Sequence, residues 1–139
     1  MEILESLSDA TSTIPSVVTI GNFDGVHRGH QAILTEVCKR ADAFKARAVV
    51  VTFDPHPLCM IAPERAPVPI STLDQKIELI GSLPIDTLLI QAFDETFRQL
   101  APEHFIKDFL VKALKVSCVC VGQNFRFGYK HGGNLSMLR

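Results

Sequence analysis

The chain has 139 residues, of which 47% are hydrophobic and 21% charged, and its formal net charge is −1. This composition is ordinary for one globular domain, and the nearly balanced charge, without a block of like charges, gives no indication of a surface for nucleic acid or an anionic membrane. No apolar run reaches the ~18–20 residues that cross a bilayer. The first fifteen residues carry three acidic side chains and no Lys or Arg. Because secretory and transit sequences are basic instead, we expect a cytoplasmic protein.

Cysteine spacing shows no metal-binding pattern. The four cysteines are Cys38, Cys59, Cys118 and Cys120. Cys118 and Cys120 alternate with valines and so share one strand face, whereas Cys38 falls on an apolar helix face. A zinc site would need a second Cys pair or two spaced histidines nearby, and neither follows. We therefore expect reduced thiols that pack as small buried hydrophobic side chains.

The first part of the chain predicts a strand and then a helix. Residues 1–15 are a lead-in, either a helical turn or a strand, ended by Pro15. Residues 16–20 are apolar and β-branched, which predicts a buried strand. A helix is predicted from near Arg28, because apolar residues then recur on one helical face. These residues are Ile33, Leu34, Val37, Cys38, Ala41 and Phe44.

The middle of the chain predicts a second strand and a second helix. Residues 47–53 are a continuous apolar run, typical of a parallel strand covered on both faces. At residues 54–57, two prolines predict a rigid loop rather than a helix. Residues 58–69 are proline-rich and irregular, which suits a mobile flap. Ser or Thr at residues 71–72 would cap a helix that runs through Leu83.

Strands and helices keep alternating toward the carboxyl terminus. Residues 86–91 predict a third strand, residues 102–114 a helix with proline and glutamate in its first turn, and residues 116–121 a fourth strand. This alternation predicts an α/β fold with a parallel sheet and right-handed crossovers. Ligands bind such sheets at the carboxyl ends of the strands. The loops expected there are residues 21–30, 54–57, 91–94 and 122–134.

Residues 21–30, Gly-Asn-Phe-Asp-Gly-Val-His-Arg-Gly-His, form the turn between the first strand and its helix. Glycine permits a tight turn and the close approach of a ligand. A helix beginning near Arg28 directs its free N–H groups and positive dipole end into this turn. His27 and His30 are three residues apart and would project to one side. The turn therefore predicts an anion site, most simply for polyphosphate. The alternative is a pair of helix-capping or core histidines.

This motif resembles the His-x-Gly-His signature of the nucleotidylyltransferase superfamily, in the form found in the FMN adenylyltransferase module of bacterial FAD synthetases. Three later blocks agree in order and spacing, and the resemblance covers nearly all of the chain after residue 14. They are Thr-Phe-Asp-Pro-His-Pro at 52–57, residues 93–109 with Leu-Ala-Pro-Glu-x-Phe at 100–105, and Gly-Gln-Asn-Phe-Arg-Phe-Gly at 122–128. The resemblance implies a Rossmann-like doubly wound parallel sheet of the nucleotidylyltransferase type.

The resemblance also implies an activity and a set of site residues. AMP passes from ATP to FMN, giving FAD and pyrophosphate, with Mg²⁺ bridging the phosphates. The catalytic residues would be His27, His30 and Asn124, with Asn124 also contacting the ATP phosphates or their Mg²⁺. ATP would be bound by Gly21, Asn22, Phe23, Asp24, Gly29 and Arg126. The flavin would be bound by Phe53, Asp54, His56, Pro57, Phe125 and Phe127.

Several of these residues have structural alternatives. Asp24 would either fix the turn by binding backbone amides or contact the nucleotide or Mg²⁺. Asp54 would either border the flavin or stabilise its own turn. Phe125 and Phe127 would either stack on a ring system or anchor their loop in the core. Arg126 offers a planar charged fork suited to phosphate.

The resembled family normally continues with a Ser/Thr-rich segment that ends in an Ile-Arg pair, and then with a riboflavin kinase domain. Neither follows Arg139, so we expect residues 1–139 to be an FMN adenylyltransferase domain truncated at its carboxyl terminus. One alternative is a catalytically silent fragment that binds ATP or flavin. Another is a nucleotidylyltransferase for pantetheine phosphate or a cytidylyl acceptor, although the blocks at residues 54–57 and 124–128 fit the flavin family better.

Overall fold

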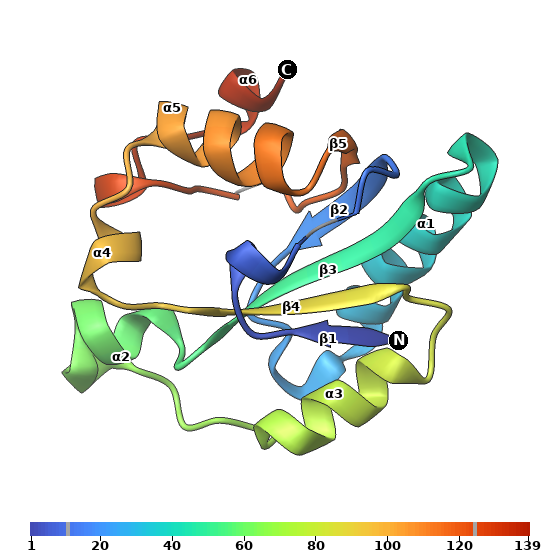
Figure 1. The fold of residues 1–139 in the computed structure, drawn as a ribbon. Coiled ribbons are helices and arrows are strands. Elements are labelled where there is room, and N and C mark those ends of the chain that lie inside the picture. Colours follow the sequence, from blue (N-terminus) through green and yellow to red (C-terminus); the bar gives the residue numbers. More distant parts are fainter. Residues whose placement is uncertain (11, 124) are drawn as a thin grey trace.

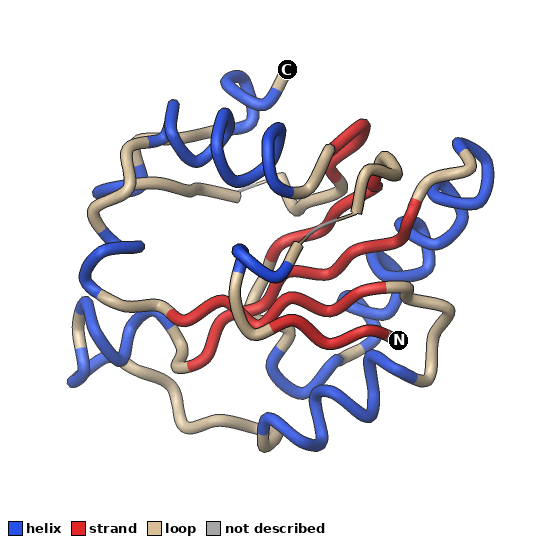
Figure 2. Tube along the Cα trace, in the orientation of Figure 1, coloured by secondary structure: helices blue, strands red, loops and turns tan. Residues whose placement is uncertain are grey.

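A five-stranded parallel sheet forms the centre of the molecule, and helices cover both of its faces (Figures 1 and 2). The computed structural model describes residues 1–10, 12–123 and 125–139. The strand order is β1-β4-β3-β2-β5, and all neighbouring strands are parallel. The strands are β1 (Glu2–Leu4), β2 (Ser16–Ile20), β3 (Arg47–Asp54), β4 (Thr87–Ala92) and β5 (Val116–Val119). The predicted α/β sheet is confirmed.

Helices alternate with these strands along the chain. They are α1 (Arg28–Phe44), α2 (Pro57–Ile61), α3 (Leu73–Gly81), α4 (Glu95–Arg98), α5 (Pro102–His104), a π-helix (Phe105–Ala113) that continues α5, and α6 (Leu135–Leu138). Short 3₁₀ turns lie at Leu7–Asp9, Asp24–Val26, Pro63–Arg65 and Tyr129–His131. In Figure 1, α1 lies to the right of the sheet and α3 below it, and α5, the π-helix and α6 lie above it.

The core has two halves, one on each face of the sheet, because successive strand residues point to opposite faces. In β3, Ala48 and Val50 pack with the residues of α1 and α3. Val49 and Val51 pack instead with the phenylalanines of the π-helix. All four residues are at most 1% exposed, which explains why β3 is apolar without interruption.

The direction in which strands are added reverses beside β2. From β2, the chain passes through α1 to β3 and through α3 to β4, moving one way across the sheet. It then crosses the opposite face through α4, α5 and the π-helix and adds β5 on the other side of β2 (Figure 1). A reversal of this kind opens a crevice at the carboxyl ends of the strands. The residues that follow Ile20 lie at this point.

The prolines at residues 54–57 do not prevent a helix, contrary to the prediction of a rigid loop. Helix α2 begins at Pro57, and the His56 imidazole Nδ1 accepts a hydrogen bond from the Leu58 N–H at 3.1 Å. Proline suits the first helical position, because the N–H that it lacks would have no partner inside the helix. The chain between α2 and α3 is otherwise irregular, as expected, apart from the turn at Pro63–Arg65.

Other local differences are small. The lead-in contains both a strand, β1, and a 3₁₀ turn, and β5 ends at Val119, earlier than predicted. Phe44 is 55% exposed and so does not belong to the inward face of α1. Cys59 is also exposed, which makes the prediction of buried thiols wrong for this residue. The other three cysteines are half-buried.

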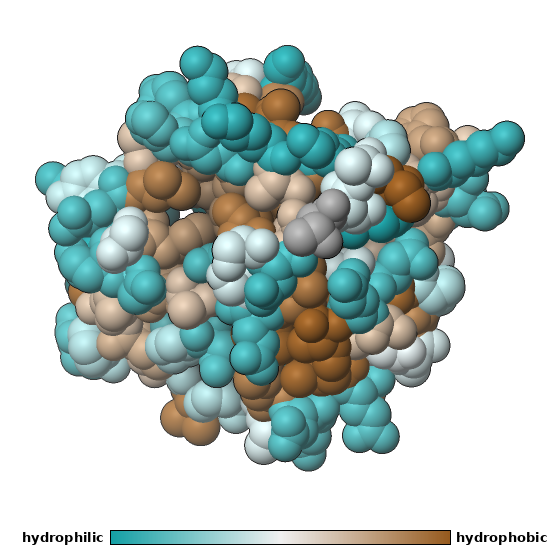
Figure 3. Space-filling model, in the orientation of Figure 1, coloured by the Kyte–Doolittle hydropathy of each residue, from teal (hydrophilic) through white to brown (hydrophobic). Residues whose placement is uncertain are grey.

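In the part of the chain that the structure describes, the helices are all too short or too polar to cross a bilayer. The face drawn in Figure 3 is largely hydrophilic, with a hydrophobic area over β1 and α3. Exposed hydrophobic side chains there are Met1 at the amino terminus (44% exposed), Ile3 of β1 (45%) and Leu79 of α3 (43%).

Candidate nucleotide-binding site

The chain leaves β2 through a turn with several left-handed residues. Phe23 (φ 51°), Gly25 (φ 75°) and Val26 (φ 43°) all adopt this conformation. Phe23 and Val26 are each 3% exposed, so their side chains hold the turn against the core. The backbone of the turn, rather than the Phe23 ring, therefore faces any ligand at the end of β2.

His27 and His30 lie together at the start of α1, as predicted. Their ring centroids are 3.5 Å apart and the rings are stacked at 18°. His27 is the N-cap of α1, where its Nδ1 accepts a hydrogen bond from the His30 N–H at 3.3 Å. Since Nδ1 is an acceptor, the neutral His27 ring carries its proton on Nε2. His27 therefore caps the helix and keeps a donor available for an anion.

Unsatisfied polar atoms gather beside this pair. The His30 Nδ1 and the Asn22 Oδ1 are buried, and neither has a hydrogen-bond partner among the described residues. Buried polar atoms are nearly always paired in folded proteins, so such atoms indicate a position that a ligand or water completes. Burial lowers the pKa of His30, and the neighbouring His27 lowers it further. His30 is thus neutral at pH 7 in the free protein.

The lowered histidine pKa values predict how stability depends on pH. Burial is the main cause for both His30 and His56. Between their ordinary pKa near 6.5 and the lower folded value, the unfolded chain binds more protons than the folded chain. We therefore expect the free energy of unfolding to fall as the pH drops below about 7. Urea denaturation from pH 5 to pH 8 measures this slope. A slope that is unchanged in His30→Ala would contradict the assignment to His30.

Gly29 leaves the space that the His27 ring occupies. A Cβ atom on Gly29 would lie 3.0 Å from the His27 Cε1 and 3.2 Å from its Nδ1. Glycine at this position therefore makes room for the ring that packs over it, and no unusual backbone conformation is involved. This reason differs from the ligand approach expected from the sequence.

Asp24 ties the turn to the segment before α3. Its carboxylate accepts hydrogen bonds from the Ile70 N–H at 3.0 and 2.9 Å, and from the Ser71 N–H at 3.1 Å and hydroxyl at 3.2 Å. The Ser71 Oγ also accepts from the Gly25 N–H at 3.0 Å. These bonds, chiefly that from Ile70, lower the pKa of Asp24. They support the structural alternative for this residue.

A cavity of about 330 Å³ lies beside the turn, between the end of β3 and α3. Three of the residues expected at the flavin, Phe53, Asp54 and His56, line it, together with Asn22 and Asp24. Pro57 is not among the lining residues. Further walls come from Pro67, Pro69, Ile70, Ser71, Thr72, Leu73, Gln75 and Lys76.

Lys76 is a lining residue that the sequence interpretation missed. It lies on α3 beside the inward residues Ile77 and Ile80, and it is 8% exposed. A charged residue on the apolar face of an amphipathic helix was the available signal.

The site residues expected in the loop after the fourth predicted strand are divided between core and surface. Phe127 is 5% exposed, and its ring centroid lies 4.9 Å from that of Phe105 and 5.8 Å from that of Phe125. This packing favours the core-anchor alternative for Phe127. Arg126 is exposed. Asn124 lies outside the described residues, so its predicted roles stay predictions.

An aromatic cluster stands at the carboxyl ends of β3 and β4. The Phe53 ring packs against Phe93 at 5.8 Å and Phe97 at 5.7 Å, and Phe93 and Phe97 are 5.7 Å apart. Phe93 directly follows β4, and the sequence interpretation gave it no role in the site. The cluster supports the Phe53 wall of the 330 Å³ cavity.

Among the described residues, no three His, Cys, Asp or Glu side chains converge as metal ligands. Both Asp24 oxygens already accept hydrogen bonds from Ile70. The described part of the chain thus provides no chelating set for a resident Mg²⁺ ion.

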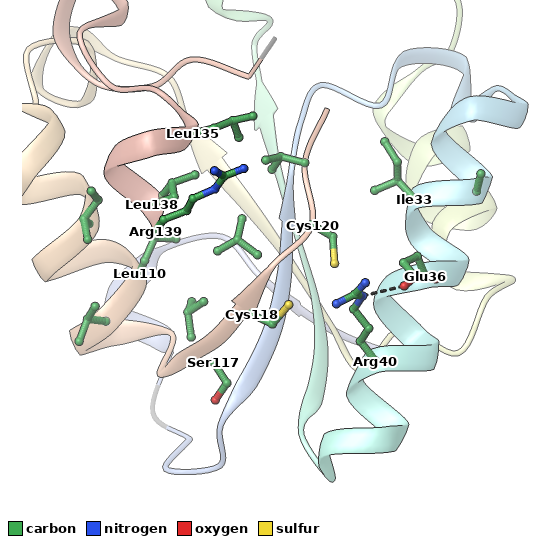
Figure 4. Close-up of a pocket in the computed structure, with 16 residues that line it drawn as sticks. Ile33, Glu36, Arg40, Leu110, Ser117, Cys118, Cys120, Leu135, Leu138 and Arg139 are labelled. Carbon is green, nitrogen blue, oxygen red and sulfur yellow. Dashed lines mark hydrogen bonds and ion pairs between the residues drawn. The ribbon is translucent and has the colours of Figure 1, made fainter. Parts of the chain in front are cut away.

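A larger cavity, of about 670 Å³, lies along the open edge of β5, away from the histidine pair. Figure 4 shows Cys118 and Cys120 directed toward Glu36 and Arg40 of α1, with Leu110, Leu138 and Arg139 on the other side of the strand. Arg40 forms an ion pair with Glu36 at 2.6 Å. Burial and the neighbouring Cys118 raise the pKa of Cys120 to about 11, so this thiol stays protonated. The lining is mostly aliphatic, which does not suit a phosphate-bearing ligand.

The fold and the histidine turn together are typical of α/β proteins that bind phosphate at the carboxyl end of a strand, and the end of β2 is the candidate position here. A family model described as FAD synthetase matches residues 9–139. The chain belongs to the FAD synthetase family.

Curated relatives share this part of their sequence with the chain. A bifunctional riboflavin kinase/FMN adenylyltransferase of Buchnera aphidicola subsp. Acyrthosiphon pisum is 37% identical over 124 residues, which cover 89% of this chain and 40% of that protein. A protein of the same name from Escherichia coli (strain K12) is 38% identical over 123 residues, covering 88% and 39%. Another, from Haemophilus influenzae, is 33% identical over 140 residues, covering 100% and 46%. The chain therefore spans less than half the length of these relatives.

A solved structure also matches the fold. The crystal structure of a macrolide-efflux protein from Streptococcus pneumoniae superposes with a TM-score of 0.77 at 25% identity. The match covers 91% of this chain and 42% of that chain. It supports the α/β architecture described above.

Proposed function

We propose that this chain is an FMN adenylyltransferase domain, which transfers AMP from ATP to FMN and releases pyrophosphate. The observation that carries the proposal is the stacked pair His27 and His30 at the end of β2, next to a cavity walled by Phe53 and His56. The curated relatives carry this activity in their names, which supports the same assignment for the part that this chain shares with them.

The reaction needs charge stabilisation more than acid–base chemistry. An FMN phosphate oxygen, already anionic, attacks the α-phosphorus of ATP, and the bond to the β-phosphate breaks with its electron pair on pyrophosphate. The His27 Nε2–H donates to phosphate oxygens on which charge develops. The backbone N–H groups of Arg28 and Gly29 lie in the first turn of α1, where the helix offers them no carbonyl partner. They can therefore also bind phosphate. Mg²⁺ enters with ATP as part of that substrate.

This chain contributes to the reaction mainly by positioning the two substrates, and not by transferring a proton. The core side chains of Phe23 and Val26 fix the turn, and the Asp24 carboxylate fixes the opposite wall through Ile70 and Ser71. Two substrates held in adjoining sites react as if in one molecule, which can supply much of the rate enhancement.

A turnover assay with ATP, FMN and Mg²⁺ tests the proposal, with FAD followed by chromatography and each ligand titrated by calorimetry. FAD formation would establish the activity in this chain. Binding of ATP and FMN without product would favour the silent-fragment alternative. Product from pantetheine phosphate, with none from FMN, would favour the other nucleotidylyltransferase alternative.

Arg126→Ala should weaken ATP binding by about 5- to 10-fold, because an exposed guanidinium that contacts phosphate contributes a charge-assisted hydrogen bond. The melting temperature of the free protein should change little, since the side chain is exposed. Calorimetry and thermal denaturation measure the two effects. A large loss of stability with unchanged affinity would show that Arg126 is structural.

A further inference from the structure

Lys76 is a buried cation without a carboxylate partner. It is 8% exposed, and its Nζ donates one long hydrogen bond, of 3.4 Å, to the Thr52 hydroxyl. Thr52 is itself fully buried, and its hydroxyl also donates to the Asn22 carbonyl oxygen at 3.0 Å. No acidic side chain among the described residues lies within ion-pair distance of Lys76. Most of the hydrogen-bonding capacity of the ammonium group is therefore unused in the free protein.

This arrangement is costly to the folded state. Burial lowers the pKa of Lys76, and the more distant carboxylates of Asp24 and Asp54 oppose that change only in part. An apolar side chain of similar volume at a buried charged position is often neutral or stabilising. A charge kept at such a cost, in a cavity, indicates a functional site.

The position of Lys76 identifies which substrate its charge would meet. It lines the 330 Å³ cavity together with Phe53 and His56, on the side where Asn22 begins the histidine turn. Burial lowers the pKa of both His30 and His56, and the charge of Lys76 adds a smaller contribution to each. Lys76 therefore stands between the candidate flavin wall and the candidate triphosphate site.

The two carboxylates that line the cavity do not form an ion pair with Lys76. The Asp24 carboxylate is occupied by hydrogen bonds from Ile70 and Ser71, and Asp54 is exposed at the rim. A compact ammonium group with free donors suits a phosphate monoester. FMN carries such a group at the end of its ribityl chain, and this phosphate must reach the α-phosphate of ATP.

We propose that Lys76 binds the phosphate group of FMN and orients its oxygen toward the α-phosphorus of ATP. This inference rests on the proposed function. Lys76 takes no proton in the step, because the attacking oxygen is already anionic, the new P–O bond forms at the α-phosphorus, and pyrophosphate leaves with the electron pair. The ammonium group also makes Lys76 a determinant of specificity, because it strengthens the binding of FMN but not that of riboflavin, which lacks the phosphate.

The experiment compares FMN and riboflavin binding in the wild-type chain, in Lys76→Met and in Lys39→Met. Methionine is unbranched like lysine but has no charge, and Lys39 is an exposed lysine of α1 that provides a charge-matched control. Calorimetry gives the dissociation constants for FMN, riboflavin and ATP. In Lys76→Met, we expect FMN to bind about 10- to 100-fold more weakly, the loss of one hydrogen-bonded charge. Riboflavin and ATP should change by less than about 3-fold, and Lys39→Met should behave as wild type.

Stability provides a second readout. Because Lys76→Met removes a buried charge, its melting temperature should be equal to or higher than that of the wild type. If the methionine variant does not fold, Lys76→Gln replaces it in the same comparison. If the wild-type chain makes FAD but Lys76→Met prefers FMN over riboflavin as strongly as the wild type does, the role of Lys76 is overturned and the proposed function is not. Equal weakening of FMN and riboflavin would do the same, since it would mark a structural residue. A wild-type chain that binds no FMN would overturn the proposed function itself.

Discussion

His30→Ala is expected to lower FAD formation about 100-fold or more while the fold stays intact. His30 is stacked on His27, and its Nδ1 is buried without a partner among the described residues. Loss of one donor aimed at developing charge typically costs about 10²–10³-fold in rate. The substitution also removes the ring on which His27 stacks, so the remaining imidazole loses its fixed orientation. Steady-state turnover at saturating ATP and FMN measures the effect.

Two controls separate catalysis from folding in this experiment. Circular dichroism and thermal denaturation should show that His30→Ala keeps its structure, because the ring is only half-buried. His104→Ala provides a matched variant, since His104 is an exposed histidine at the end of α5, and it should retain normal turnover. Near-normal turnover in His30→Ala would remove this residue from the mechanism.

Gly29→Ala is expected to lower turnover by up to about 10-fold without lowering stability. The added Cβ would lie 3.0 Å from the His27 Cε1, so the ring must move by a few tenths of an ångström. Displacement of a catalytic group by about 1 Å can cost as much as 10²-fold in rate, and this smaller shift should cost correspondingly less. The stability of α1 should increase, because alanine favours the helical conformation more than glycine does.

Gly81→Ala is the matched control for this second variant. Gly81 is also helical, and its added Cβ would meet only the Met1 Cε, at 3.4 Å, within ordinary contact distance. Turnover in Gly81→Ala should therefore equal that of the wild type. If Gly29→Ala turned over normally, or if its melting temperature fell sharply, the contact with His27 would not explain why glycine occupies this position.

The sequence predicts the strand, turn and helix around residues 16–44 well, because their signals are local. β-branched residues form the strand, and the apolar spacing after Arg28 defines α1. The meeting of His27 and His30 also follows from local geometry, since one helical turn separates them. The two prolines at residues 54–57 predict a loop, but α2 starts at Pro57, because proline at the first helical position favours a helix.

Features that depend on distant parts of the chain could not be predicted. Asp24 is bonded to Ile70 and Ser71, 46 and 47 residues away, and nothing near Asp24 in the sequence indicates that contact. The charge of Lys76 on the apolar face of its helix is visible in the sequence, but its contact with Thr52 of β3, and through it with the turn after β2, is not. The packing of Phe127 with Phe105 likewise depends on a tertiary arrangement that local spacing does not specify.

The bonds from Asp24 to Ile70 and Ser71 join the two halves of the site mechanically. Asp24 belongs to the turn that would hold the triphosphate, and Ile70 and Ser71 belong to the wall of the flavin cavity. If ATP binding shifts the turn, the shift would reach that wall through the Asp24 carboxylate and through the hydrogen bond from the Gly25 N–H to the Ser71 Oγ. Thermodynamic reciprocity then requires FMN to alter the affinity for ATP by the same factor as ATP alters the affinity for FMN. The hydrogen bonds of Asp24 and Ser71 would then couple the two proposed substrate sites.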